Sequence, residues 1–173
     1  MKKYLHSLGI KSKIAFKEKI NTKTKNKVLI DFANLIRKEK KLILKKNLKD
    51  VQNARRKKLK DNLISRLVLD SNKINQIIKS VKIIAKLKDP ENIILKKWTR
   101  PNGLRIKKIT IPIGVVGVIY ESRPNVTSDV SSLCFKSGNC VILKGGSEAY
   151  HTNKSIVNFF RKLLKINNLN QNY

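Results

Sequence analysis

The first hundred residues place apolar side chains with the spacing of amphipathic helices. Leu29, Phe32, Ala33 and Ile36 fall at positions i, i+3, i+4 and i+7, which is one stripe along a helix. A second stripe follows Asp70 and Ser71, either of which is a candidate N-cap, and contains Ile74, Ile77, Ile78, Val81, Ile84 and Ala85. Asp89-Pro90 should end it, because the residue before a proline avoids the helical region. Both stripes indicate core packing.

The pattern changes after the turn at 101–103. Alternation over 104–109 predicts an exposed strand or hairpin arm. The continuous run 114–120 is rich in β-branched residues and predicts a strand covered on both faces. Residues 140–143 predict another strand, and 149–165 a helix. The polar tail from 167 to 173 should be frayed.

A helix over 127–137 should connect the two strands. Asn125 or Thr127 could cap it, Gly138 suits the position after its end, and the expected inward residues are Val130, Leu133 and Cys134. Strands joined by a helix are parallel, with a right-handed crossover. The chain is therefore expected to be an α/β protein whose ligand site lies at the carboxyl ends of these strands.

Composition fits a single domain with a core, but the charge needs separate treatment. The net charge of +29 favours a polyanion partner. However, residues 109–153 are neutral, and the basic residues are 32 Lys against 8 Arg. Lys, Asn and Ile make up 72 of 173 residues, as AT-rich codons would produce. Mutational bias is the preferred interpretation and nucleic-acid binding the alternative, because phosphate and base recognition favours Arg.

Other function classes have little support in the sequence. Cys134 and Cys140 lack metal-ligand spacing, so we expect no metal site and two reduced, buried thiols. The longest apolar stretch, 111–120, is too short to cross a bilayer, and no secretory signal follows Met1. A cytoplasmic protein without a membrane partner is expected.

Candidate chemistry gathers in two loops that follow the predicted strands. In the first, Asn125 could donate to an oxyanion or merely cap a helix, and Arg123 could clamp an anion or pair with Glu121. The second is Lys144, Gly145, Gly146, Ser147 and Glu148. There a lysine can meet a phosphate, glycines allow close backbone approach, a glutamate can accept from ribose hydroxyls, and the next helix N-terminus favours an anion. An ordinary strand-to-helix turn is the alternative.

The segment from 111 to 153, IPIGVVGVIYESRPNVTSDVSSLCFKSGNCVILKGGSEAYHTN, strongly resembles the gamma-glutamyl phosphate reductases (glutamate-5-semialdehyde dehydrogenases) of the aldehyde dehydrogenase superfamily. Weaker agreement extends the resemblance from about residue 5 to 165. It implies an aldehyde-dehydrogenase-like fold, with N-terminal helices followed by an incomplete, Rossmann-like βαβ unit. The implied divisions are a helical part at 1–97, an oligomerisation arm at 98–111 and a partial NADP-binding unit at 112–173.

The resemblance also implies a reaction in proline biosynthesis. A cysteine thiolate attacks L-glutamyl 5-phosphate (gamma-glutamyl phosphate), phosphate leaves, and NADPH reduces the thioester to L-glutamate 5-semialdehyde. Asn125 would be the oxyanion donor, and Lys144 with Ser147 or Glu148 would contact the adenosine ribose and its 2′-phosphate. The resemblance further implies a homo-oligomer in the intact enzyme. Glutamate 5-kinase is a possible partner.

The chain departs from the family in its length. It should be the N-terminal portion only, without the catalytic domain and its nucleophilic cysteine. We therefore expect the isolated chain to be inactive, and marginally stable because of an unpaired sheet edge. A polyanion-binding remnant of a decayed reductase and a non-functional truncated product are the alternatives.

Overall fold

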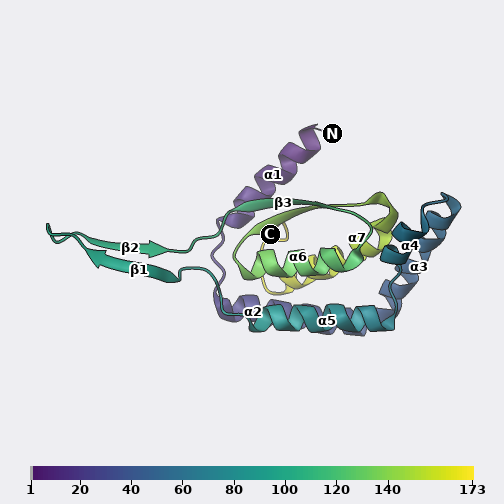
Figure 1. The fold of residues 1–173 in the computed structure, drawn as a ribbon, viewed down its shortest axis with the longest axis horizontal. Coiled ribbons are helices and arrows are strands. Elements are labelled where there is room, and N and C mark those ends of the chain that lie inside the picture. The colour runs from purple at the N-terminus through teal and green to yellow at the C-terminus, as the bar shows by residue number, and fades with distance from the viewer. Residues whose placement is uncertain (1) are drawn as a thin grey trace.

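A computed structural model describes residues 2–173 as a helical body from which one hairpin projects (Figure 1). The helices are α1 (Lys2–Phe16), α2 (Thr22–Lys38), α3 (Lys40–Arg56), α4 (Asp61–Leu67), α5 (Ser71–Lys86), α6 (Pro124–Lys136) and α7 (Tyr150–Ile166), with a 3-10 turn η1 at Ser147–Ala149. The strands are β1 (Ile94–Thr99), β2 (Arg105–Ile109), β3 (Val115–Tyr120) and β4 (Cys140–Gly145).

The two predicted apolar stripes meet in the core. Helices α2 and α5 pack along each other, and every residue of both stripes is buried. Asp70 is the N-cap of α5, since its carboxylate accepts from the backbone N–H of Lys73 at 2.7 Å. Aromatic rings continue the core in edge-to-face contacts from Phe32 to Phe160, Phe135 and Tyr173.

The βαβ prediction is confirmed, because β3 and β4 pair in parallel with α6 between them in sequence. Among residues 2–173 they form a two-stranded sheet. One prediction about it was wrong: β3 is not covered on both faces, since Ile119 is 86% exposed. Tyr120 on the other face contacts α6 through a hydrogen bond to Thr127. The continuous apolar run indicated burial of both faces, but within the described residues the face of Ile119 is packed only at the start of the strands, where Val115 and Cys140 join the core.

Helix α6 also differs from its prediction. It begins at Pro124, so Asn125 and Thr127 lie within its first turn and Arg123 is the N-cap residue. Proline is favourable at this first position because its missing N–H would have no helical partner. Leu133 is 48% exposed, whereas Ser128, Ser131 and Ser132 are buried. The small serine side chains let α6 approach its neighbours closely. Close packing of the backbone therefore decides which face of α6 is inward, and the predicted stripe of Val130, Leu133 and Cys134 does not. Gly138 follows the helix with a φ of +72°, as predicted.

The hairpin pairs β1 with β2 from Ile94 onward, so it includes residues before the predicted oligomerisation arm at 98–111, which stays a prediction. One terminal feature needs correction as well. The polar tail is not frayed: the Tyr173 hydroxyl donates to the carbonyl of Gly138 at 3.1 Å, and the Asn170 N–H donates to Glu18 at 3.0 Å. The ring of Tyr173 completes the aromatic series, which explains why the tail is held.

A buried ammonium fixes the base of the hairpin to α2. Lys25, 1% exposed, donates to Asp89 at 3.1 Å and to Glu91 at 2.8 Å. Burial raises the pKa of Asp89, but hydrogen bonds from Glu91, Thr22 and Lys25 outweigh it and hold the pKa below its ordinary value. The ionised carboxylate therefore stabilises the fold, because it is bound more favourably in the folded chain than in the unfolded one.

We expect Asp89→Asn to lower the free energy of unfolding by about 1–3 kcal/mol at pH 7, because Lys25 loses one of its two anionic partners. A group with a depressed folded pKa contributes stability above its unfolded pKa, about 3.9, and loses it as pH falls through the folded value. The difference between wild type and variant should therefore shrink below about pH 4. Urea unfolding over a pH series measures it. Asp31→Asn, in an exposed pair with Lys27, is the control and should cost under about 0.5 kcal/mol; an equal cost for both variants would contradict the assignment.

Candidate active-site edge

The parallel register brings both candidate loops to one edge of the β3–β4 pair. Tyr120 pairs with Gly145 at the carboxyl end of the strands. The loop that carries Arg123 and Asn125 therefore starts beside the loop that starts at Lys144. A hydrogen bond joins the two loops, because the buried hydroxyl of Ser122 donates to Glu148 Oε1 at 2.7 Å. The sequence placed both loops at strand ends, but nothing in it singled out Ser122.

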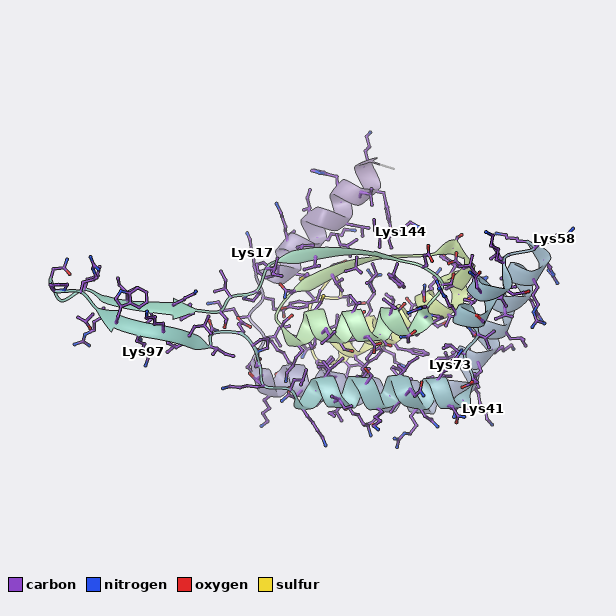
Figure 2. The ribbon with its side chains drawn as sticks, viewed as in Figure 1. Lys17, Lys41, Lys58, Lys73, Lys97 and Lys144 are labelled. Carbon is purple, nitrogen blue, oxygen red and sulfur yellow. The ribbon has the colours of Figure 1, made fainter. Side chains whose placement is uncertain are left out.

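Lys144 and Ser147 are exposed at this edge. Lys144 pairs in register with Ile119, so its side chain lies on the open face of the sheet, opposite α6. Figure 2 shows Lys144 on this side of β3. Its ammonium has one long hydrogen bond, 3.3 Å, to the carbonyl of Gly145. A lysine held so weakly is available to a phosphate or a ribose hydroxyl.

The two glycines are used by the protein itself. A Cβ on Gly146 would lie 1.9 Å from Glu148 Oε1, so the missing side chain lets the glutamate fold back toward Ser122. A Cβ on Gly145 would lie 2.5 Å from Nδ2 of Asn153 and 3.0 Å from the ring of Tyr120. Neighbouring side chains of the protein thus occupy the space beside both glycines, and the close approach of a cofactor to them stays a prediction.

Beneath Gly145 lies a buried polar cluster of Tyr120, Thr127 and Asn153. The hydroxyls of Tyr120 and Thr127 are 2.6 Å apart, and Thr127 donates to Asn153 Oδ1 at 2.9 Å. Burial raises the pKa of Tyr120, although its bond to Thr127 opposes the shift. The cluster joins the end of β3 to the first turns of α6 and α7. It therefore fixes the helix that carries Asn125 relative to the Lys144 loop.

The N-terminus of α7 is already bound to an anion. Asp50 of α3, 2% exposed, accepts from the backbone N–H groups of His151 at 3.1 Å and Thr152 at 2.8 Å. It also accepts from the Thr152 hydroxyl at 2.6 Å. This helix terminus was expected to favour a ligand anion. Its N–H groups at His151 and Thr152 are instead bound by a carboxylate of the chain itself. Asp50 lies a hundred residues away in sequence, so no local pattern revealed it.

Asn125 and Arg123 lie beside a cleft between α6 and the α4–α5 region. Asn125 is exposed and its amide donates to Asp129 at 3.3 Å, which leaves its second N–H free to meet an oxyanion. Glu121 does not pair with Arg123; its carboxylate lies 3.9 Å from Arg66. Asp129 was not among the site residues predicted from the sequence. Its position four residues after Asn125, on the same helix face, could have identified it.

Neither cysteine is suited to nucleophilic attack. Burial raises the pKa of Cys134, and burial, with the charges of Glu18 and Cys134, raises the pKa of Cys140 to about 12. Across residues 2–173, no group of His, Cys, Asp and Glu is arranged to hold a metal ion. No helix in the same part of the chain has the length and apolar character needed to cross a membrane.

Known proteins resemble this chain in fold and in sequence. No protein-family model matches the chain. Its fold matches a probable aldehyde dehydrogenase from Listeria monocytogenes with a TM-score of 0.68 at 10% identity, over 98% of this chain and 35% of that one. It matches the gamma-glutamyl phosphate reductase of Thermotoga maritima with a TM-score of 0.92 at 38% identity, over 97% of this chain and 41% of that one. The fold is that of the aldehyde dehydrogenase superfamily.

In sequence the chain is related to the gamma-glutamyl phosphate reductases and corresponds to a part of them. It is 44% identical over 150 residues to the reductase of Thermodesulfovibrio yellowstonii, which is 87% of this chain and 36% of the relative. It is 50% identical over 137 residues to that of Caldanaerobacter subterraneus subsp. tengcongensis, 79% of this chain and 33% of the relative. The chain thus spans about a third of the length of these curated relatives.

We expect Gly145→Ala to destabilise the chain by about 1–3 kcal/mol, because the new Cβ must displace Asn153 or Tyr120 from a packed interior. Thermal unfolding followed by circular dichroism measures the effect. Gly117→Ala is the matched control in β3, since a Cβ there would meet nothing within 4 Å, and it should change stability by at most about 0.5 kcal/mol. Equal losses for the two variants would contradict the packing assignment.

Proposed function

We propose that the chain is the N-terminal, cofactor-binding portion of an NADPH-dependent reductase that converts L-glutamyl 5-phosphate to L-glutamate 5-semialdehyde and phosphate in proline biosynthesis. The observation that carries the proposal is the shared edge of β3 and β4. There the segment that leads into α6 and Asn125 lies next to the Lys144 loop, and the hydrogen bond from Ser122 to Glu148 links the two. The relatives named gamma-glutamyl phosphate reductase supply the reaction.

The residues at this edge suit a nicotinamide dinucleotide. Lys144 offers a weakly bound ammonium, Ser147 an exposed hydroxyl, and Glu148 one carboxylate oxygen in addition to the one bound by Ser122. Lys144 and Ser147 would contact a 2′-phosphate, and Glu148 would accept from a ribose hydroxyl; the ammonium of Lys144 is the group that favours NADP over NAD. When bound, the cofactor supplies a hydride. Gly145 and Gly146 hold the loop in its folded-back form.

In this proposal Asn125 donates the hydrogen bond that stabilises the oxyanion formed at the substrate carbonyl, and Arg123 holds an anionic group of the substrate. The nucleophilic cysteine belongs to a catalytic domain outside residues 1–173. The raised pKa values of Cys134, which is half-buried, and of Cys140, which is buried, support this division. The parts 1–97 and 112–173 would together bind the cofactor.

The exposure of the projecting hairpin supports a role in oligomerisation. Its two strands are almost wholly exposed, and an isolated two-stranded hairpin is marginal in water. We propose that residues 98–111, together with the rest of β1, form an oligomerisation arm in the intact enzyme, that the enzyme works in the cytoplasm, and that glutamate 5-kinase is a possible supplier of its substrate.

The distribution of lysines favours the enzyme over a polyanion-binding protein. The labelled lysines of Figure 2 extend from Lys97 on the hairpin to Lys58 beyond α3, with Lys17 and Lys41 on other parts of the body. A nucleic-acid site needs cations gathered along one face. The wide separation of these labelled lysines agrees with mutational bias and favours the enzyme over the nucleic-acid alternative.

Purified 1–173 should show no NADPH-dependent release of phosphate from L-glutamyl 5-phosphate. A thiol with a pKa of about 12 is ionised in only about one molecule in 10⁵ at pH 7. The complete Thermotoga maritima reductase, assayed alongside, is the positive control. Phosphate release by the isolated chain above the rate without protein would refute the division of the active site proposed here.

We expect the same chain to bind NADPH, and Lys144→Met to weaken that binding about tenfold or more, because a charge-assisted hydrogen bond contributes about 1.5–3 kcal/mol. Fluorescence of the reduced nicotinamide reports the titration. Lys97→Met removes an equal charge from the distant hairpin and should leave the affinity unchanged. Loss of affinity in both variants would indicate general charge attraction and count against a cofactor site at Lys144.

A further inference from the structure

The cleft beside Asn125 contains charges of both signs. It has a volume of about 380 Å³ and lies between the α4–α5 region and the first turns of α6. Leu69 and Ile77, both buried in the core, form an apolar part of its wall. Its polar lining includes Arg66, Lys73, Ser80, Arg123, Asn125 and Asp129. A cleft with an apolar wall and separate cationic and anionic groups suits a small zwitterion with an aliphatic chain.

The two arginines of the cleft are free to bind a ligand. Arg123 is exposed, and among residues 2–173 its guanidinium makes no hydrogen bond or ion pair. Arg66 has one loose contact, 3.9 Å to Glu121, and both of these side chains are largely exposed. Such a pair contributes little stability, so a ligand carboxylate can replace it. The planar guanidinium fork matches a carboxylate with two parallel hydrogen bonds.

Lys73 has a different role in the cleft. Its ammonium donates to the carbonyl of Val68 at 2.6 Å and that of Ser65 at 3.4 Å. It therefore binds the free carbonyl groups at the end of α4, the helix that carries Arg66. Figure 2 shows Lys73 toward the end of α5 that lies near α4. Lys73 adds positive charge and holds Arg66 in place, but its own donors are engaged.

Asp129 supplies the negative charge. Its carboxylate accepts from the Ser80 hydroxyl at 2.9 Å and from the Asn125 amide at 3.3 Å. Both donors are neutral, so the charge of Asp129 is oriented without being cancelled. An ionised carboxylate has about four acceptor positions, which leaves room for an ammonium. The shared bond with Asn125 places this acceptor next to the proposed oxyanion donor.

We propose that this cleft binds the α-amino-acid end of the substrate, with Arg123 and Arg66 on the α-carboxylate and Asp129 on the α-ammonium. The inference rests on the proposed function, since only a short aliphatic chain separates the reacting carbonyl at Asn125 from these two groups in a glutamyl phosphate. Leu69 and Ile77 would contact the methylenes of that chain. The site would thereby select glutamyl phosphates over simple acyl phosphates, which lack both charged groups.

The test is an NMR titration of purified, ¹⁵N-labelled 1–173 with three small ligands. L-Glutamate carries both groups, glutarate lacks the amine, and 4-aminobutyrate lacks the α-carboxylate. We expect glutamate to bind at least about tenfold more tightly than either analogue, with shifts at the cleft. Asp129→Asn should abolish the preference over glutarate, and Arg123→Gln should reduce the preference over 4-aminobutyrate.

Arg37→Gln, an exposed arginine of α2 outside this cleft, is the matched control and should leave both preferences unchanged. Equal affinities for the three ligands on the unmodified chain would overturn the proposal even where a variant does not fold. Preferences that survive both cleft variants would overturn it too. An NADPH titration of the same sample separates the two proposals: NADPH binding without a preference for glutamate rejects the amino-acid site alone, whereas failure of NADPH binding rejects the proposed function.

Discussion

Two side chains on one turn of α3 hold the active-site edge in place. Asn47 and Asp50 are each 2% exposed, although both are polar. Asn47 donates to the carbonyl of Leu67 at 2.9 Å and accepts from the N–H of Leu69 at 2.8 Å, so it fixes the link between α4 and α5. Asp50 fixes the start of α7. A buried polar group without partners is costly, so these bonds leave α4 and the Lys144 loop little freedom to move relative to α3.

The chain uses its lysines in two distinct ways. Most are exposed and contribute charge without a partner, whereas Lys25 and Lys136 are 1% and 2% exposed. Lys136 donates to the side chain of Asn26 and to the carbonyl of Ala85, and burial holds its pKa below the ordinary value, with the charge of Asp89 opposing that shift. Both buried ammonium groups lie at α2, near the end of α5 and the base of the hairpin. The net charge of the chain therefore says little about what stabilises it.

Much of the fold could be predicted, because the signals that specify it are local. Short stretches of sequence predict the helical stripes, the Asp70 cap and the role of Gly138. They also predict the strand–helix–strand order. The inward face of α6 was not predictable from an apolar stripe, because Ser128, Ser131 and Ser132 are buried there beside Phe135 whereas Leu133 is exposed. Lys144 and Asn125 could be located from strand ends. Ser122, Asn153 and Arg66 could not, because their importance arises only where distant segments meet.

The contacts that complete the structure have a consequence for the order in which the chain folds. Asp50 and Thr152 are 102 residues apart, and Glu18 and Asn170 are 152 apart. On the ribosome, α3 therefore emerges long before Thr152, whose N–H and hydroxyl groups satisfy the buried carboxylate of Asp50. Loop-closure entropy also makes such distant contacts slow to form. During synthesis the early helices thus remain exposed to chaperones and proteases, and native packing waits for α7 and the residues after it.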